Sequence, residues 1–193
     1  MKHLILPSLK VSLMLLAANV AVHADDNIVE NGDFEKKAAE GQEWPAGWAK
    51  PKAGGEWGKE GGNRFLSLKS SQPGEMVMLY QEFKIPAGAQ ALELSWKQRV
   101  TGLKKGTSPW FDARIMLEFS NAERVRMPGS PKAPNAGKDT SGWEEKKVSF
   151  LVTENSAFLK FMPCLFQVAA GTFDLDDVVI KKIDPSEVVP AKK

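Results

Sequence analysis

Apolar and polar residues alternate along two stretches of the chain, residues 91–101 and 112–120. The apolar positions are Leu92, Leu94, Trp96 and Val100 in the first stretch and Ala113, Ile115, Leu117 and Phe119 in the second. The alternate positions of the second stretch, expected to face outward, are Asp112, Arg114, Met116 and Glu118. Because successive strand residues point to opposite faces of a sheet, each stretch is predicted to be a strand with one buried face.

Further strands are predicted over 63–69, 76–85, 143–152, 157–168 and 172–181. Clusters of Gly, Pro, Asn and Ser bound most of them, and no segment has a helical period. Together with an N-terminal strand within 27–35, they predict an all-β fold, an antiparallel β-sandwich of the jelly-roll type. The Gly- and Lys-rich segment 50–62 is expected to be an exposed loop, and 126–142 a long loop over one sheet.

Residues 1–24 have the features of a signal peptide. Lys2 and Lys10 supply positive charge, residues 11–22 form an apolar core, and Ala24 ends a small-residue cleavage site. The apolar run is too short to span a bilayer, and no later stretch is long enough. We therefore expect an exported protein, periplasmic or extracellular, with one domain over 25–183 and a disordered tail over 184–193.

Charge and residue usage exclude several classes of function. Without Lys2 and Lys10, 24 of the 26 basic residues remain to balance 24 acidic ones, and no basic tract favours nucleic acid as a partner. Both histidines, His3 and His23, lie in the signal segment, which excludes histidine-dependent hydrolases and histidine-ligated metals. The only cysteine, Cys164, stands among apolar residues and is expected to be a buried, unreactive thiol.

Three carboxylates, those of Asp174, Asp176 and Asp177, interrupt the apolar last strand. A buried anion is costly unless a cation or dense hydrogen bonding compensates it. The segment 27–35 is also rich in oxygen ligands, so a hard cation such as calcium would fit between the first and last strands. Solvated aspartates at a capped strand end explain the same residues equally well.

Four motifs follow one another along the chain: the segment 27–35, Trp48, Gly142-Trp143 and Leu175-Asp-Asp-Val178. Their order resembles the carbohydrate-binding modules of families 4, 9 and 22, of the galactose-binding-like jelly-roll type. The stretches Pro109-Trp-Phe-Asp-Ala-Arg-Ile115, Met162-Pro-Cys-Leu-Phe166 and Gly171-Thr172 resemble a bacterial branch found beside glycoside hydrolases. The resemblance implies non-catalytic binding of a polysaccharide or oligosaccharide, here by a monomer. It also implies a structural calcium ion, bound by the backbone oxygen of Asp33, by Asn63 and Asp176, and by Glu35 as an additional carboxylate.

Sugar sites stack aromatic rings on pyranose faces and hydrogen-bond the hydroxyls with polar side chains. Trp48, Trp96 and Trp143 are expected in the core, whereas Trp110 and Trp57 fall in predicted loops. The predicted ligand-binding residues are Trp110, Arg99, Arg114, Glu118 and Trp57, with Arg99 reaching the Trp110 patch if the two strands lie close. Two alternatives stay open: a structural or interaction protein of the cell envelope without a glycan ligand, and a sandwich-fold glycosidase with a carboxylate pair.

Overall fold

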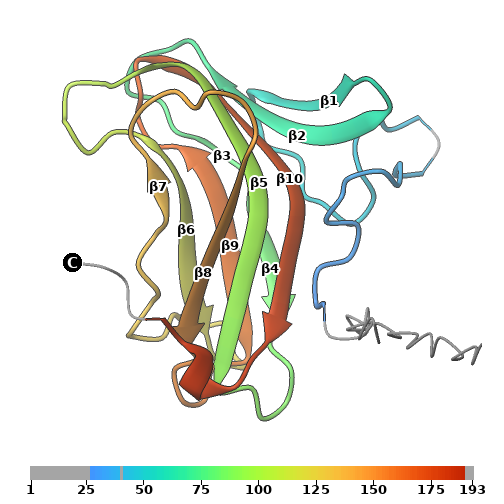
Figure 1. Cartoon of the computed structure of the whole chain (residues 1–193), viewed down its shortest axis with the longest axis vertical. Helices are drawn as coiled ribbons and strands as arrows, with labels where there is room; N and C mark the ends of the chain where they lie inside the picture. Colours follow the sequence, from blue (N-terminus) through green and yellow to red (C-terminus); the bar gives the residue numbers. More distant parts are fainter. Residues whose placement is uncertain (1–26, 40, 190–193) are drawn as a thin grey trace, which may run out of the picture.

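A computed structural model describes residues 27–39 and 41–189 of the 193-residue chain, so the predicted signal peptide lies outside the described residues. The described residues form an antiparallel β-sandwich (Figure 1), as the alternation predicts. No helix among them is long and apolar enough to cross a membrane. The strands are β1 (Gly55–Glu60), β2 (Asn63–Ser70), β3 (Val77–Met78), β4 (Gln81–Lys84), β5 (Ala91–Lys104), β6 (Ala113–Ser120), β7 (Asn135–Ala136), β8 (Glu144–Leu151), β9 (Phe158–Leu165) and β10 (Ala170–Lys182).

Two sheets make the sandwich. One sheet, here called the β10 sheet, has the order β1-β2-β10-β5-β8, so the last strand lies at its centre. The other, the β9 sheet, has the order β3-β9-β6-β7, with β4 also paired to β9. β5 and β6 follow each other along the chain but belong to different sheets. Their polar faces therefore point to opposite sides of the molecule.

The core lies between the two inner faces. The apolar residues predicted to face inward from β5 and β6 are all buried, which confirms the alternation. Trp48 and Trp96 are also buried, as predicted. From the central strands, Phe161 of β9 and Phe173 of β10 add two of the largest fully buried side chains. Burial of each such side chain contributes about 1.5–3 kcal/mol, so the facing sheets are held mainly by these contacts.

The segment 27–35 lies beside the last strand, as predicted, although only Asn27 forms a β-bridge, with Lys181, and residues 30–33 form a turn. The Ile28 amide donates to the Ile180 carbonyl at 2.9 Å, and the Val178 amide donates to the Gly32 carbonyl at 2.9 Å. Earlier along β10, residues 171–175 pair with β2 on the same edge. One edge of β10 is therefore shared by two partners, and the change of partner coincides with a register shift between Asp176 and Val179.

Two aromatic side chains anchor the segment 27–35. Phe34 is fully buried, and its ring meets that of Trp48 edge-on at 4.8 Å between centroids. The Trp48 indole donates to the Asn31 carbonyl at 2.9 Å. Trp48 therefore closes the core beneath the first segment, which is the role that the sequence predicts for it.

Four predicted segment boundaries need correction. The segment 50–62 is not wholly a loop, because it contains edge strand β1. The predicted strand 76–85 is divided into β3 and β4, which keep one register on β9. The long loop 126–142 contains the short strand β7, which pairs with β6.

The fourth correction concerns the tail. A 3₁₀ helix occupies Pro185–Glu187, and the Asp184 side chain caps it by accepting from the Ser186 amide. The Val189 amide then donates to the Ser149 hydroxyl at 3.0 Å. Expecting disorder from residue 184 is therefore wrong for 184–189, because a capping box and contacts with β8 hold these residues. Residues 190–193 lie outside the described part.

Candidate ligand-binding face

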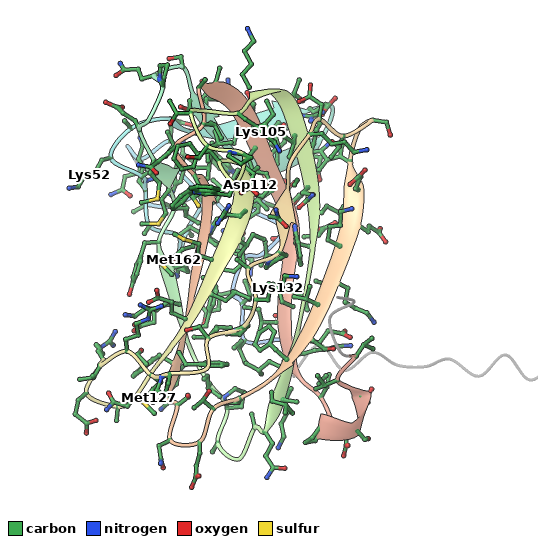
Figure 2. The ribbon with its side chains drawn as sticks, turned by 90° about the vertical axis from the view of Figure 1, so that its left-hand side faces the viewer. Lys52, Lys105, Asp112, Met127, Lys132 and Met162 are labelled. Carbon is green, nitrogen blue, oxygen red and sulfur yellow. The ribbon has the colours of Figure 1, made fainter. Side chains whose placement is uncertain are left out.

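The outer face of the β9 sheet carries aromatic, sulfur-containing and charged side chains in cross-strand rows. Read from β3 and β4 across β9 to β6, the rows are Met78–Cys164–Arg114, Tyr80–Met162–Met116 and Glu82–Lys160–Glu118. A bond from the Leu79 amide to the Pro163 carbonyl, 3.0 Å long, carries the register through the gap between β3 and β4. In Figure 2, sulfur atoms gather on the side of the sandwich where Met162 is labelled. We call this surface the β9 face.

Trp110 stands at one end of the β9 face, just before β6. Its side chain is 61% exposed, the largest exposed fraction among the tryptophans of the described chain. A turn closed by the bond from the Phe111 amide to the Ser108 carbonyl, 3.1 Å long, presents the indole. The Phe111 ring supports it edge-on at 6.1 Å. Trp110 is therefore in a turn and open to solvent, as predicted, rather than a lid on the core.

Arg114 is held in place beside Trp110. Its Nε lies 2.6 Å from Asp112 Oδ1, and a terminal nitrogen donates to the Trp110 carbonyl. Asn135 donates to the other Asp112 oxygen at 2.6 Å, and the guanidinium lies 4.7 Å over the ring of Phe166. Asp112 follows the predicted outward parity but is only 3% exposed, because these neighbours cover it. Its carboxylate orients Arg114 instead of meeting solvent.

The opposite end of the β9 face is charged. Glu118 lies 3.3 Å from Arg126, and Glu82 pairs with Arg124. Lys160 stands between the two carboxylates in the cross-strand row. The half-exposed Tyr80 in the neighbouring row has its phenol pKa raised, first by burial and then by the charge of Glu82. Tyr80 is a candidate ligand contact that the sequence analysis missed, since strand parity alone does not show that β3 and β4 share this sheet.

Arg99 does not share the β9 face, so the expectation that it reaches the Trp110 patch is wrong. It extends from β5 on the outer face of the β10 sheet. Its Nε lies 2.8 Å from Asp174, and a terminal nitrogen lies 2.8 Å from Glu60. Its guanidinium also lies 4.7 Å over the Trp143 ring.

Trp143 is not in the core, contrary to expectation. It is half-buried just before β8, with its ring edge-on to that of Phe65 at 5.4 Å. Trp57 is misplaced as well, because it lies in strand β1 rather than in a loop. Its indole donates to the Phe34 carbonyl at 2.9 Å, and Arg64 covers its ring at 4.2 Å. These contacts give Trp57 a structural role away from the β9 face.

The residues predicted to bind calcium come from segments that do meet. The side-chain amide of Asn63 donates to Asp176 Oδ2 at 2.7 Å. Next to it, the backbone amide of Arg64 donates to Glu35 Oε1 at 2.6 Å. Asp33 lies in the adjacent turn, and its carboxylate is 3.5 Å from the Glu35 amide. The four residues therefore lie around the point where β10 changes partner.

The donor types at this point fit a hard cation. Asp176 is only 3% exposed, and burial is the main reason why its pKa is raised. Its described partners are two neutral N–H groups, from Asn63 and from the Asp177 backbone. A turned Asn63 amide would offer its oxygen instead. Carboxylates alone do not complete a site, since no group of three or more His, Cys, Asp or Glu side chains within the described ranges is placed to hold a metal.

No protein-family profile and no curated protein matches the chain, whereas solved structures do. The enzymatically active domain of tailspike protein 4 of bacteriophage CBA120 matches 81% of this chain with a TM-score of 0.59 and 13% identity. This chain covers 21% of that longer one. A structure described as a family 4 carbohydrate-binding module matches 80% of this chain and 99% of its own, with a TM-score of 0.52 and 13% identity.

Another match is a family 61 module in complex with β-1,4-galactotriose, with a TM-score of 0.50 and 15% identity over 81% of this chain and 99% of that one. An arabinose-bound family 51 α-L-arabinofuranosidase matches with a TM-score of 0.56 and 12% identity over 81% of this chain and 26% of the enzyme. Identities this low establish the fold alone. The chain has the two-sheet antiparallel jelly-roll fold of carbohydrate-binding modules, a fold that also occurs as part of longer enzymes.

Proposed function

We propose that the β9 face binds a polysaccharide or oligosaccharide without catalysing its hydrolysis. The observation that carries this proposal is Trp110, 61% exposed beside an Arg114 whose direction is fixed by Asp112 at 2.6 Å. An exposed indole provides a flat apolar surface for a sugar ring, and a held guanidinium donates to its hydroxyls. Glu118 remains a predicted ligand contact at the far end of the same face.

The carboxylates of the β9 face favour binding over catalysis. Each of Asp112, Glu118 and Glu82 is paired with an arginine. A glycosidase needs one carboxyl group that keeps its proton as the acid and a second that acts as base or nucleophile. In each of these pairs a guanidinium already engages the carboxylate, so the group is not left open toward a ligand. We therefore keep the glycosidase as a lower alternative.

A panel of soluble polysaccharides run in affinity electrophoresis tests the function. Retention on one or more glycans without release of reducing sugar supports the proposal. Release of reducing sugar would favour the glycosidase instead. No retention on any glycan would favour a structural or interaction protein.

Replacing Trp110 by alanine tests the site. Loss of a stacking contact of about 1 kcal/mol weakens binding roughly fivefold. Because the indole is mostly exposed, the melting temperature should change little. Leu151→Ala is the matched control, since Leu151 is 58% exposed on β8 of the other sheet. A large fall in melting temperature for Trp110→Ala would show instead that the indole closes the core.

The proposal includes calcium and export. We propose that Asp33, Glu35, Asn63 and Asp176 hold a structural calcium ion, which would compensate the buried Asp176 carboxylate where β10 changes partner. We also propose that residues 1–24 are removed on export to the periplasm or the extracellular space. N-terminal sequencing of the secreted protein should then begin at Asp25, and a chain retained with Met1 would contradict it.

A further inference from the structure

Most sulfur atoms of the domain lie on one face. After residue 24 the chain has five methionines and one cysteine, at positions 76, 78, 116, 127, 162 and 164. Four of these six side chains occupy two adjacent rows of the β9 face, since Met78 lies opposite Cys164 and Met116 lies opposite Met162. Nothing in the proposed binding of sugars requires sulfur at these positions.

Three of the four side chains can meet at one point. Met162 and Cys164 are two residues apart on β9 and therefore face the same side. Met116 stands across from Met162 on β6, and Met78 stands across from Cys164 on β3. Residues directly opposite in an antiparallel pair have Cβ atoms about 5 Å apart, and diagonal neighbours about 7–8 Å. Flexible methionine side chains span these separations, so the sulfur atoms of Met116, Met162 and Cys164 can converge. Met78 lies on the other side of β9, two strands from Met116, and does not join them.

The cluster lies below the surface rather than in solvent. Cys164 is fully buried, Met162 is 7% exposed, and Met78 and Met116 are half-buried. Arg114, opposite Cys164, directs its charge to Asp112 at 2.6 Å. The two rows contain no carboxylate, the donor that a hard cation would need. Thioether and thiol sulfur are instead the ligands that select Cu(I).

We propose that the β9 face holds a binding site for a soft monovalent cation, Cu(I), formed by the thioethers of Met116 and Met162 with Cys164 as a third sulfur. A thiol that coordinates as thiolate releases its proton to water. An apolar floor for a ligand is the competing role of these residues. Leucine would serve that role as well as methionine, and this difference allows the two roles to be separated.

The experiment titrates the full chain with Ag(I), a soft cation that does not need an anaerobic solution, and then with Cu(I) against a chromophoric Cu(I) chelator. We expect one equivalent to be taken from the chelator. Met116→Leu and Met162→Leu should each weaken binding at least tenfold. Methionine-to-leucine changes conserve volume and usually cost less than about 1.5 kcal/mol, so the variants should fold. Met127→Leu is the matched control, because Met127 packs against the core elsewhere.

Two results would overturn the proposal. One is failure of the unmodified chain to compete for either cation. The other is binding that survives in the Met116→Leu/Met162→Leu double variant but disappears in Cys164→Ser, which would reduce the site to a reactive thiol. This inference does not rest on glycan binding. The leucine variants keep an apolar floor, so polysaccharide retention should persist in them whether or not the metal is bound.

Discussion

Replacing Asp176 by asparagine should shift thermal stability in opposite directions with and without calcium. Without the ion, Asp176 is a buried carboxylate whose pKa is raised chiefly by burial. An acid with a raised folded pKa binds its proton more tightly when folded, so stability rises as pH falls from the raised pKa toward the unfolded value of about 3.9. At neutral pH the ionised carboxylate therefore destabilises the folded state. A neutral side chain of the same shape, such as asparagine, removes this destabilisation.

Asparagine also preserves the local hydrogen bonds. Its side-chain oxygen can accept from the Asp177 amide, which now lies 2.8 Å from Asp176 Oδ1. Its amide can donate to a turned Asn63, which now lies 2.7 Å from Asp176 Oδ2. In a chelator at neutral pH, the Asp176→Asn variant should consequently melt above the unmodified protein. Lowering the pH toward 4 should stabilise the unmodified protein relative to the variant. The difference between their melting temperatures should therefore become smaller.

With calcium the order should reverse. An ion that binds only the folded state adds RT ln(1 + [L]/Kd), about 2.7 kcal/mol at a concentration of 100 Kd. For a domain of this length, each kcal/mol moves the melting temperature by about 2–4 °C, so the unmodified protein should gain about 5–11 °C. The variant has lost the buried carboxylate ligand and should gain little. Scanning calorimetry in chelator and in saturating calcium measures all four values.

Asp177→Asn is the matched control, because Asp177 is a half-exposed neighbour paired with Lys97 at 2.8 Å. It should change the free energy of unfolding by no more than about 0.5 kcal/mol in either condition. The calcium proposal fails if the unmodified protein melts at the same temperature in both solutions. The reasoning about burial fails if Asp176→Asn is less stable than the unmodified protein in chelator.

Three further predictions address the rest of the structure. Arg99→Leu should lower the free energy of unfolding in urea by about 3 kcal/mol, because it leaves the buried Asp174 unpaired. The double variant Arg99→Leu/Asp174→Leu should recover part of this free energy. No recovery would mean that loss of the ion pair is not the cause. Because burial raises the Cys164 pKa to about 12, iodoacetamide at pH 8 should label it only after unfolding, and mass spectrometry of the folded protein would reveal the contrary. Asp139 accepts from the Gly102 amide at 2.8 Å and from the Leu103 amide at 2.7 Å. Asp139→Ala should therefore lower the free energy of unfolding by about 1 kcal/mol and expose both amides to hydrogen exchange. Unchanged exchange would contradict this.

The sequence predicts which residues of a strand face the core better than it predicts which strands pair. The alternation in β5 and β6 identified the buried residues because parity is a local property of a strand. The same alternation could not show that β5 and β6 join different sheets, so Arg99 and Arg114 were placed together although they face opposite sides. Which sheet a strand joins depends on pairing between residues distant in the chain, and a single sequence does not reveal it.

Strand β1 was missed for a different reason. Its glycines and charged residues have low intrinsic preference for strands. Pairing with β2 overrides that preference, and Gly58 has a specific use there. A Cβ on Gly58 would lie 2.5 Å from the Phe65 ring, which packs over the bare backbone. A glycine covered by an aromatic ring on the neighbouring strand of a hairpin is a cross-strand feature, which the composition of the strand itself does not show.

The central position of β10 determines the order in which this domain can fold. β2 and β5 flank β10, so their sheet lacks its middle strand until the chain has been synthesised past residue 182. The segment 27–35, made first, likewise waits for β10 as its partner. Folding of the β10 sheet is therefore a late event that closes contacts across almost the whole chain, which makes it slow compared with folds built from local contacts. A nascent chain of this topology emerges from the ribosome without its native core and completes that core only after the last strand is free.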